Sequence, residues 1–128
     1  MKKLVIIGML LGGIFARNSI DVGSHGEWSF NQSTLQAFYM LEAITIDGVD
    51  PDAEGADIVG AFFNDVCVGF YPAGAAYTTV PLMGNDGPST SDYMSAGDVA
   101  ELRYYDASND AILELSPGNF IFPIFFSN

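Results

Sequence analysis

The segment Ile58-Val-Gly-Ala-Phe-Phe-Asn-Asp-Val-Cys-Val-Gly-Phe-Tyr71 decides the fold of this chain. Apolar residues lie on both sides of Asn64-Asp65, and these two residue types tolerate the left-handed backbone that a two-residue type I′ turn requires. The segment therefore predicts a β-hairpin in which residue 63 faces 66, 61 faces 68 and 59 faces 70. The predicted core face of the hairpin consists of Val59, Ala61, Phe63, Val66, Val68 and Phe70.

The opposite face of this hairpin holds Gly60 and Gly69, which the predicted register places directly across from each other. Two such glycines leave a gap that an aromatic ring, such as that of Trp28, or a second backbone can fill. Cys67 is the one cysteine, so an intrachain disulfide is excluded. We interpret Cys67 as a small buried hydrophobe, with an intermolecular disulfide as the alternative.

A second hairpin is predicted from Asp98–Tyr105, a turn over 106–110, and Ala111–Leu115. Its first strand alternates apolar residues with Glu101 and Arg103, as a half-buried strand does. We expect Arg103 to pair with a carboxylate on the neighbouring strand.

The segment Ser33–Ile46 allows two interpretations. Ser33 followed by Gln36 fits a helix capping box, whereas residues 43–46, which precede an Asp-Gly turn, are strand-like. We predict a long central strand, because a single helix would leave one face of the surrounding β segments uncovered.

Turn-forming residues recur about every ten residues along the chain, which is the spacing of an all-β sandwich or barrel. At 128 residues the chain is long enough for one domain with its own core. We therefore predict an all-β fold, an antiparallel β-sandwich of jelly-roll or immunoglobulin-like type, in a single domain.

The first residues have the layout of a secretory signal peptide, with two lysines, the apolar stretch Leu4–Phe15, and a change to polar residues after Ala16. We predict residues 1–16 as the signal peptide, residues 17–128 as the domain, and a secreted or cell-surface location. A retained anchor or a buried first strand is the alternative. The polar segment Arg17–Glu27 is expected to be free to reach a neighbouring subunit.

The segment 119–126 is too apolar to remain in water, and Pro123 excludes a central, fully paired strand position. It is expected either to close its own domain as an edge strand or to be donated to another subunit. The residues predicted to mediate assembly are Phe120, Phe122, Ile124 and Phe126.

Sixteen acidic residues against four basic ones give a net charge of −12. Such a surface repels phosphate backbones and anionic lipids, so neither nucleic acid nor a membrane is an expected partner. The chain has one histidine, His25, and neither a G-x-S-x-G elbow nor a P-loop, so the common hydrolytic and phosphoryl-transfer sites lack parts. We predict that the protein is not an enzyme, although sequence alone leaves open a pair of carboxylates of the glycosidase kind.

The acidic loop 47–57 carries the strongest chemical signal. Asp50, Asp52 and Glu54 alternate before Gly55, like the first half of an EF-hand loop, but the twelfth position is Ala61, so the loop is not an EF-hand. A looser calcium site is the hypothesis, with a solvated acidic turn as the alternative. Its predicted ligands are Asp50, Asp52, Glu54 and Asp57. Separately, Asn31-Gln-Ser33 matches the glycosylation acceptor pattern.

Several of these segments resemble modules in large secreted proteins of Bacteroidetes-related and marine bacteria. Those modules carry a VGAF-x-(N/D)G-x-C-x-G hairpin and a later GD…F-x-x-YD strand, and they often accompany type IX secretion sorting signals. The corresponding segments here are Phe30–Tyr39, Asp57–Gly69, Val80–Gly87, Tyr93–Asp98 and Tyr104–Asp106. The resemblance implies an extracellular β-sandwich with a surface, adhesive or structural role, and it offers no catalytic residues to carry over. This chain lacks the further cysteines that related modules hold after the hairpin.

The leading functional hypothesis is an extracellular structural subunit that assembles with copies of itself into a filament or surface layer, by exchange of the apolar strand 119–126. The alternative is a carbohydrate-binding or adhesion module that recognises surface glycans, with or without calcium. Six tyrosines and Trp28 beside acidic loops support the alternative.

Overall fold

The computed structural model describes residues 17–46, 48, 56–74, 77–116 and 126–127. In this part of the chain the regular structure is β-strand, apart from two single 3₁₀ turns, η1 (Gly23–His25) and η2 (Pro88–Thr90). Every pair of neighbouring strands is antiparallel. The predicted all-β, antiparallel sandwich in a single domain is confirmed, whereas the choice between a jelly roll and an immunoglobulin-like fold stays a prediction.

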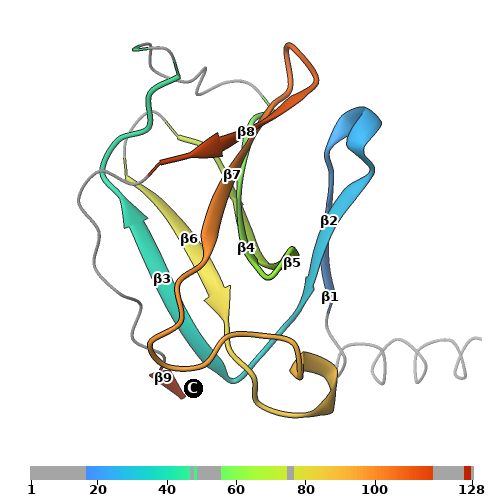
Figure 1. Ribbon diagram of the computed structural model, residues 1–128. Coiled ribbons are helices and arrows are strands. Elements are labelled where there is room, and N and C mark those ends of the chain that lie inside the picture. Colours follow the sequence, from blue (N-terminus) through green and yellow to red (C-terminus); the bar gives the residue numbers. More distant parts are fainter. Residues whose placement is uncertain (1–16, 47, 49–55, 75–76, 117–125, 128) are drawn as a thin grey trace, which may run out of the picture.

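The described strands form three sheets (Figure 1). The first sheet is a hairpin of β1 (Arg17–Asp21) and β2 (Glu27–Asn31). The second has the order β6 (Thr78–Met83), β3 (Leu35–Leu41), β9 (Phe126–Ser127). The third has the order β5 (Val66–Pro72), β4 (Ile58–Phe63), β7 (Glu101–Asp106), β8 (Ala111–Leu115).

The main core, which we call the inner core, lies between the second and third sheets. Val59, Val68, Val80 and Leu82 are all fully buried there, so β4, β5 and β6 contribute its centre. The buried residues of the inner core are Ala37, Tyr39, Ile44, Val59, Ala61, Val68, Ala73, Val80, Leu82, Met94, Ala100, Leu102 and Tyr104.

A smaller outer core lies on the other face of the third sheet and is covered by the β1–β2 hairpin (Figure 1). It consists of Val22, Trp28, Ile58, Phe62 and Tyr105. The ring of Trp28 meets that of Phe62 edge to face, with 5.1 Å between their centroids. Because β1 pairs along its whole length with β2, the expectation that residues 17–27 are free to reach a neighbour is wrong.

The predicted hairpin exists, and its turn residues Asn64 and Asp65 both have positive φ, 49° and 63°. The predicted register is correct next to the turn, where Phe63 faces Val66, but it is wrong further along the strands. Phe62 faces Cys67 while Ala61 faces Gly69, so Val68 is an extra residue, a β-bulge. One extra residue reverses the alternation of the strand beyond it. Phe70 therefore packs against the outer core instead of the inner one.

The bulge also separates the two glycines that were predicted to face each other. Gly60 pairs with Phe70 and lies under the ring of Trp28, whose atoms stand 2.7 Å from where a Cβ would be. Gly69 pairs with Ala61, and its missing side chain leaves room for the backbone carbonyl of Pro81 in β6. One glycine thus admits an aromatic ring and the other admits a second backbone.

The remaining strand predictions are largely confirmed. The second hairpin is β7 and β8, and segment 33–46 forms a central strand rather than a helix. This strand, β3, ends at Leu41 instead of continuing to Ile46. Its partner β6 begins at Thr78, which pairs with Leu41, so the chain beyond Leu41 has no neighbour in β6.

Candidate functional site

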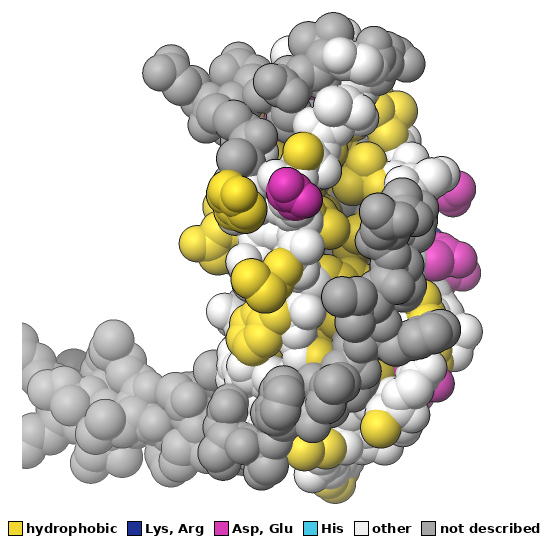
Figure 2. Space-filling view, turned by 90° about the vertical axis from the view of Figure 1, so that its left-hand side faces the viewer, with side chains coloured by type: hydrophobic (Ala, Val, Ile, Leu, Met, Phe, Trp, Pro, Cys, Tyr) yellow, Lys and Arg dark blue, Asp and Glu magenta, His cyan; other side chains and the backbone are white. Residues whose placement is uncertain are grey.

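The outer face and second edge of β3 form the first candidate site, which we call the assembly face. Alternation along β3 buries Ala37 and Tyr39 in the inner core and turns Phe38 and Met40 outward. Phe38 is 49 % exposed and Met40 is 80 % exposed. Figure 2 views the side of the molecule where β3 lies, and hydrophobic side chains are exposed across it. Large apolar side chains that gather on one face often mark an interaction surface.

The second edge of β3 is where the C-terminal segment meets the sheet. One edge of β3 pairs with β6 from Gln36 to Leu41. The other edge pairs with β9 at two positions, Leu35 with Ser127 and Gln36 with Phe126. Among the described residues, 37–41 have no partner along this second edge. Of the four predicted assembly residues, Phe126 therefore lies in a strand beside β3, whereas Phe120, Phe122 and Ile124 lie outside the described residues.

A second candidate site is an open pocket of about 390 Å³ between the β4–β5 turn and the loop after η2. We call it the turn pocket. Its lining residues are Phe63, Asn64, Val66, Ser91, Asp92 and Tyr93.

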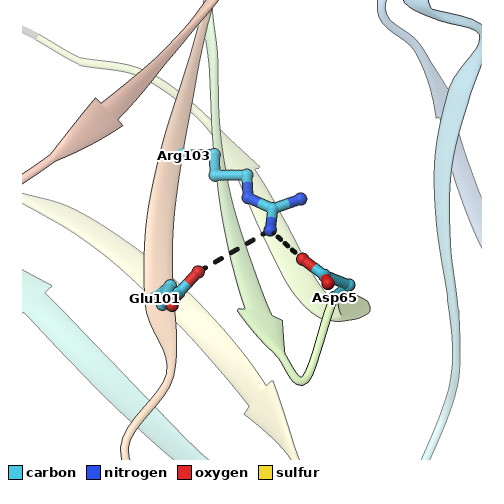
Figure 3. A network of polar contacts seen from close by, with 3 residues as sticks. All are labelled: Asp65, Glu101 and Arg103. Atoms are coloured by element: carbon cyan, nitrogen blue, oxygen red, sulfur yellow. Dashed lines mark hydrogen bonds and ion pairs between the residues drawn. The ribbon is translucent and has the colours of Figure 1, made fainter.

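The turn side of this pocket is held in place by Arg103. The Nη2 atom of Arg103 lies 2.6 Å from Oδ1 of Asp65 in the turn and 3.6 Å from Oε2 of Glu101 (Figure 3). Its guanidinium carbon also lies 4.2 Å from the centre of the Phe62 ring, a cation–π contact. The expected pairing of Arg103 with a carboxylate is confirmed, although Asp65 belongs to the turn of the neighbouring hairpin and Glu101 to the same strand.

The loop side of the pocket is tied to the rest of the fold by Tyr93 and Asn31. The backbone N–H of Asn31 donates to the hydroxyl oxygen of Tyr93 at 2.7 Å, and its side-chain Nδ2 donates to the carbonyl of Ser89 at 2.9 Å. Burial raises the pKa of Tyr93 above its ordinary value. The predicted glycosylation nitrogen of Asn31 thus makes a structural hydrogen bond, and its modification stays a prediction.

Asp86 fastens the same loop to the start of β3. Its Oδ2 accepts hydrogen bonds from the backbone N–H of Thr34 at 2.7 Å and from the Thr34 hydroxyl at 2.9 Å. The hydroxyl of Thr90 donates to Oδ1 at 2.7 Å. These donors, the Thr34 N–H first among them, favour the ionised carboxylate and lower the pKa of Asp86 to about 2.

Of the four predicted calcium ligands, the structure describes only Asp57. Asp50, Asp52 and Glu54 lie outside the described residues, whereas Asp57 is buried at the start of β4. Its Oδ2 accepts a hydrogen bond from the Tyr104 hydroxyl at 2.6 Å, and its Oδ1 accepts one from the backbone N–H of Ala107 at 2.8 Å. In the described ranges no three acidic, histidine or cysteine side chains gather in a way that could hold a metal ion. The calcium hypothesis stays a prediction.

The two other singled-out residues have structural contacts. His25 is exposed in η1, and its Nε2 donates to the carbonyl of Asp110 at 2.9 Å. Cys67 is half-buried beside the outer core, and burial raises the pKa of its thiol to about 11. A thiol with so high a pKa is largely protonated and unreactive at neutral pH.

Sequence reasoning singled out Phe126, which pairs with the second edge of β3, but it missed the exposed face of β3 and the turn pocket. The assembly face had a local signal, because Phe38 and Met40 are large apolar residues that alternate with the buried Ala37 and Tyr39. The turn pocket had none, since its two walls come from residues 63–66 and 91–93, which only the tertiary fold brings together.

Comparisons with known proteins found no matching family model, no matching curated protein and no matching solved structure. No helical turn in the described residues is long and apolar enough to span a membrane.

Proposed function

We propose that the protein is an extracellular structural subunit that assembles with copies of itself through the assembly face of β3. The observation that carries the proposal is the second edge of β3, which β9 pairs at Leu35 and Gln36 beside the exposed Phe38 and Met40. Backbone pairing of this kind is the same whether β9 comes from its own chain or from a neighbour. Head-to-tail exchange between identical subunits propagates without closing and yields fibres, whereas reciprocal exchange gives a closed dimer.

Charge opposes this assembly and makes it dependent on ionic strength. Subunits with a net charge of −12 repel one another in dilute salt. The range of that repulsion falls to about 10 Å at 0.1 M salt, while burial of Phe38 and Met40 in an interface is not screened. Polymer mass should therefore rise with salt concentration. If calcium binds at the predicted site, calcium should give a larger polymer mass than sodium does at equal ionic strength.

A disulfide trap at the β3–β9 pair tests the proposal. The variant combines Leu35→Cys and Ser127→Cys with Cys67→Ala, because residues 35 and 127 are direct partners in the antiparallel ladder. Such partners have Cα atoms about 4.5–5.5 Å apart, which is within the range of a disulfide. Oxidation of exchanged subunits should give a ladder of covalent oligomers on a non-reducing gel, and electron microscopy should show filaments.

Matched surface variants separate strand exchange from packing of the face. Phe38→Ser combined with Met40→Ser should shorten or abolish filaments, whereas Val99→Ser, at an apolar residue 43 % exposed outside β3, should leave them unchanged. An oxidised trap that is entirely monomeric, together with dispersed particles in every salt condition, would refute self-assembly.

A further inference from the structure

We propose that the turn pocket binds a neutral sugar ring, such as a pyranose unit of a glycan. The inference is independent of self-assembly, because the pocket lies at the β4–β5 turn and the assembly face at β3. It gives the carbohydrate-binding alternative a place in the fold. Its volume of about 390 Å³ falls within the range of about 300–1,000 Å³ that small-molecule sites occupy.

The lining combines the two kinds of group that recognise a sugar. Phe63 and Tyr93 supply aromatic side chains against which the C–H face of a sugar ring can pack. Asn64 offers a donor and an acceptor, Ser91 offers both through one hydroxyl, and Asp92 offers acceptors. A polyol presents donors and acceptors on neighbouring carbons, so this mixture fits it.

The polar groups of the pocket are available to a ligand. No hydrogen bond within the described residues uses the side chain of Asn64, Ser91 or Asp92, and all three residues are exposed. The groups that hold the walls are different ones, namely Asp65 with Arg103 on the turn and the Tyr93 hydroxyl with Asn31 on the loop. Because those contacts order the two walls, binding of a ligand would have to order only the side chains of Asn64, Ser91 and Asp92.

Charge narrows the class of ligand. Asp92 is the one carboxylate in the lining, and a hard cation such as calcium takes six to eight oxygen ligands, so the pocket does not suit such a cation. An acidic sugar would meet both Asp92 and a net charge of −12. A cationic group is the competing occupant, since aromatic rings and a carboxylate also attract cations. The two uncharged polar partners, Asn64 and Ser91, favour the neutral sugar.

Amide spectra of the ¹⁵N-labelled full chain test the inference. The probes are methyl glycopyranosides of the gluco, galacto, manno, fuco, xylo and N-acetylglucosamine series, with choline as the cationic probe and glucuronate as the acidic one. At least one neutral glycoside should give saturable shifts confined to residues 63–66 and 91–93. Choline and glucuronate should give none there.

Two variants remove pocket groups without disturbing the fold. Asn64→Gly deletes the amide at a position with positive φ that glycine adopts readily. Ser91→Ala deletes the hydroxyl, and Ser95→Ala in the same loop, outside the lining, is its control. Loss of one hydrogen bond should weaken binding about two- to tenfold for each pocket variant, with no change for Ser95→Ala.

Three results would overturn the inference: silence across the neutral glycosides, a response to choline alone, or equal sugar affinity in Asn64→Gly, Ser91→Ala and Ser95→Ala. Filaments tumble too slowly to give sharp amide signals, so the spectra are recorded in dilute salt, where repulsion between subunits with a net charge of −12 keeps them dispersed.

Discussion

The substitution Gly69→Ala should destabilise the protein severely, because the added methyl group meets backbone rather than a side chain. It would overlap the carbonyl group of Pro81 in β6 and approach the backbone nitrogen of Leu82. A carbonyl in a strand cannot rotate aside, so β5 and β6 must separate. Their separation would loosen Val68, Val80 and Leu82, which are fully buried at the centre of the inner core.

Overpacking a core costs about 1–3 kcal/mol, and a backbone clash lies at or above the upper end of that range. For a domain of this size about 1 kcal/mol corresponds to roughly 4 °C in the unfolding midpoint, so Gly69→Ala should lower it by about 12 °C or more. Gly60→Ala is the matched comparison. Its methyl group meets ring atoms of Trp28 at 2.7–2.8 Å, and a ring can shift, so about 1–2 kcal/mol is expected.

Gly87→Ala serves as the neutral control, because nothing lies within 4 Å of its added methyl group and its φ of 163° is ordinary extended backbone. It should change the free energy of unfolding by less than about 0.5 kcal/mol. Thermal unfolding followed by circular dichroism, with urea unfolding as a second probe, measures all three variants. If Gly69→Ala were as stable as Gly87→Ala, the close approach of β5 to Pro81 would be incorrect.

Two further predictions concern carboxylates that hold loops. Asp57→Ala removes the acceptor for the Tyr104 hydroxyl and the Ala107 N–H, so urea unfolding should show a loss of about 2–4 kcal/mol, and Asp57→Asn, which keeps one oxygen, should lose less. If both variants kept the free energy of unfolding of the unmodified protein, these hydrogen bonds would contribute little to stability. Asp86 has a pKa lowered to about 2 from an ordinary value of 3.8, so its stabilisation is present above about pH 4 and disappears as the pH falls through 2. Between pH 4 and 2, Asp86→Asn should therefore lose less stability than the unmodified protein, and parallel acid-unfolding curves would contradict this.

The local parts of the fold were predictable because their signals lie close together in sequence. Both hairpins follow from alternation around turn residues, and Asn64 and Asp65 adopt the left-handed conformation that their residue types allow. The bulge at Val68 was not predicted, because the neighbouring Gly69 fits a bulge and a close backbone approach equally well and the sequence does not distinguish them.

The candidate sites depended on contacts between distant segments. The pairing of Leu35 with Ser127 joins residues from opposite parts of the chain, and no local pattern specifies such a partner. Likewise, Asp57 was interpreted as a calcium ligand from its acidic neighbours, but its own carboxylate bonds to Tyr104 and Ala107 in the β7–β8 hairpin.

By itself the sequence determined the all-β class and the two hairpins, because side-chain alternation and turn chemistry act over a few residues. Only the tertiary structure decided where that alternation breaks and which segment packs on each face. The bulge sends Phe70 to the outer core, Gly69 lets β5 approach β6, and Arg103 fixes the turn that borders the pocket. Each of these outcomes depends on contacts between segments that are distant in the sequence, and in a strand a shift of one residue reverses every side chain that follows.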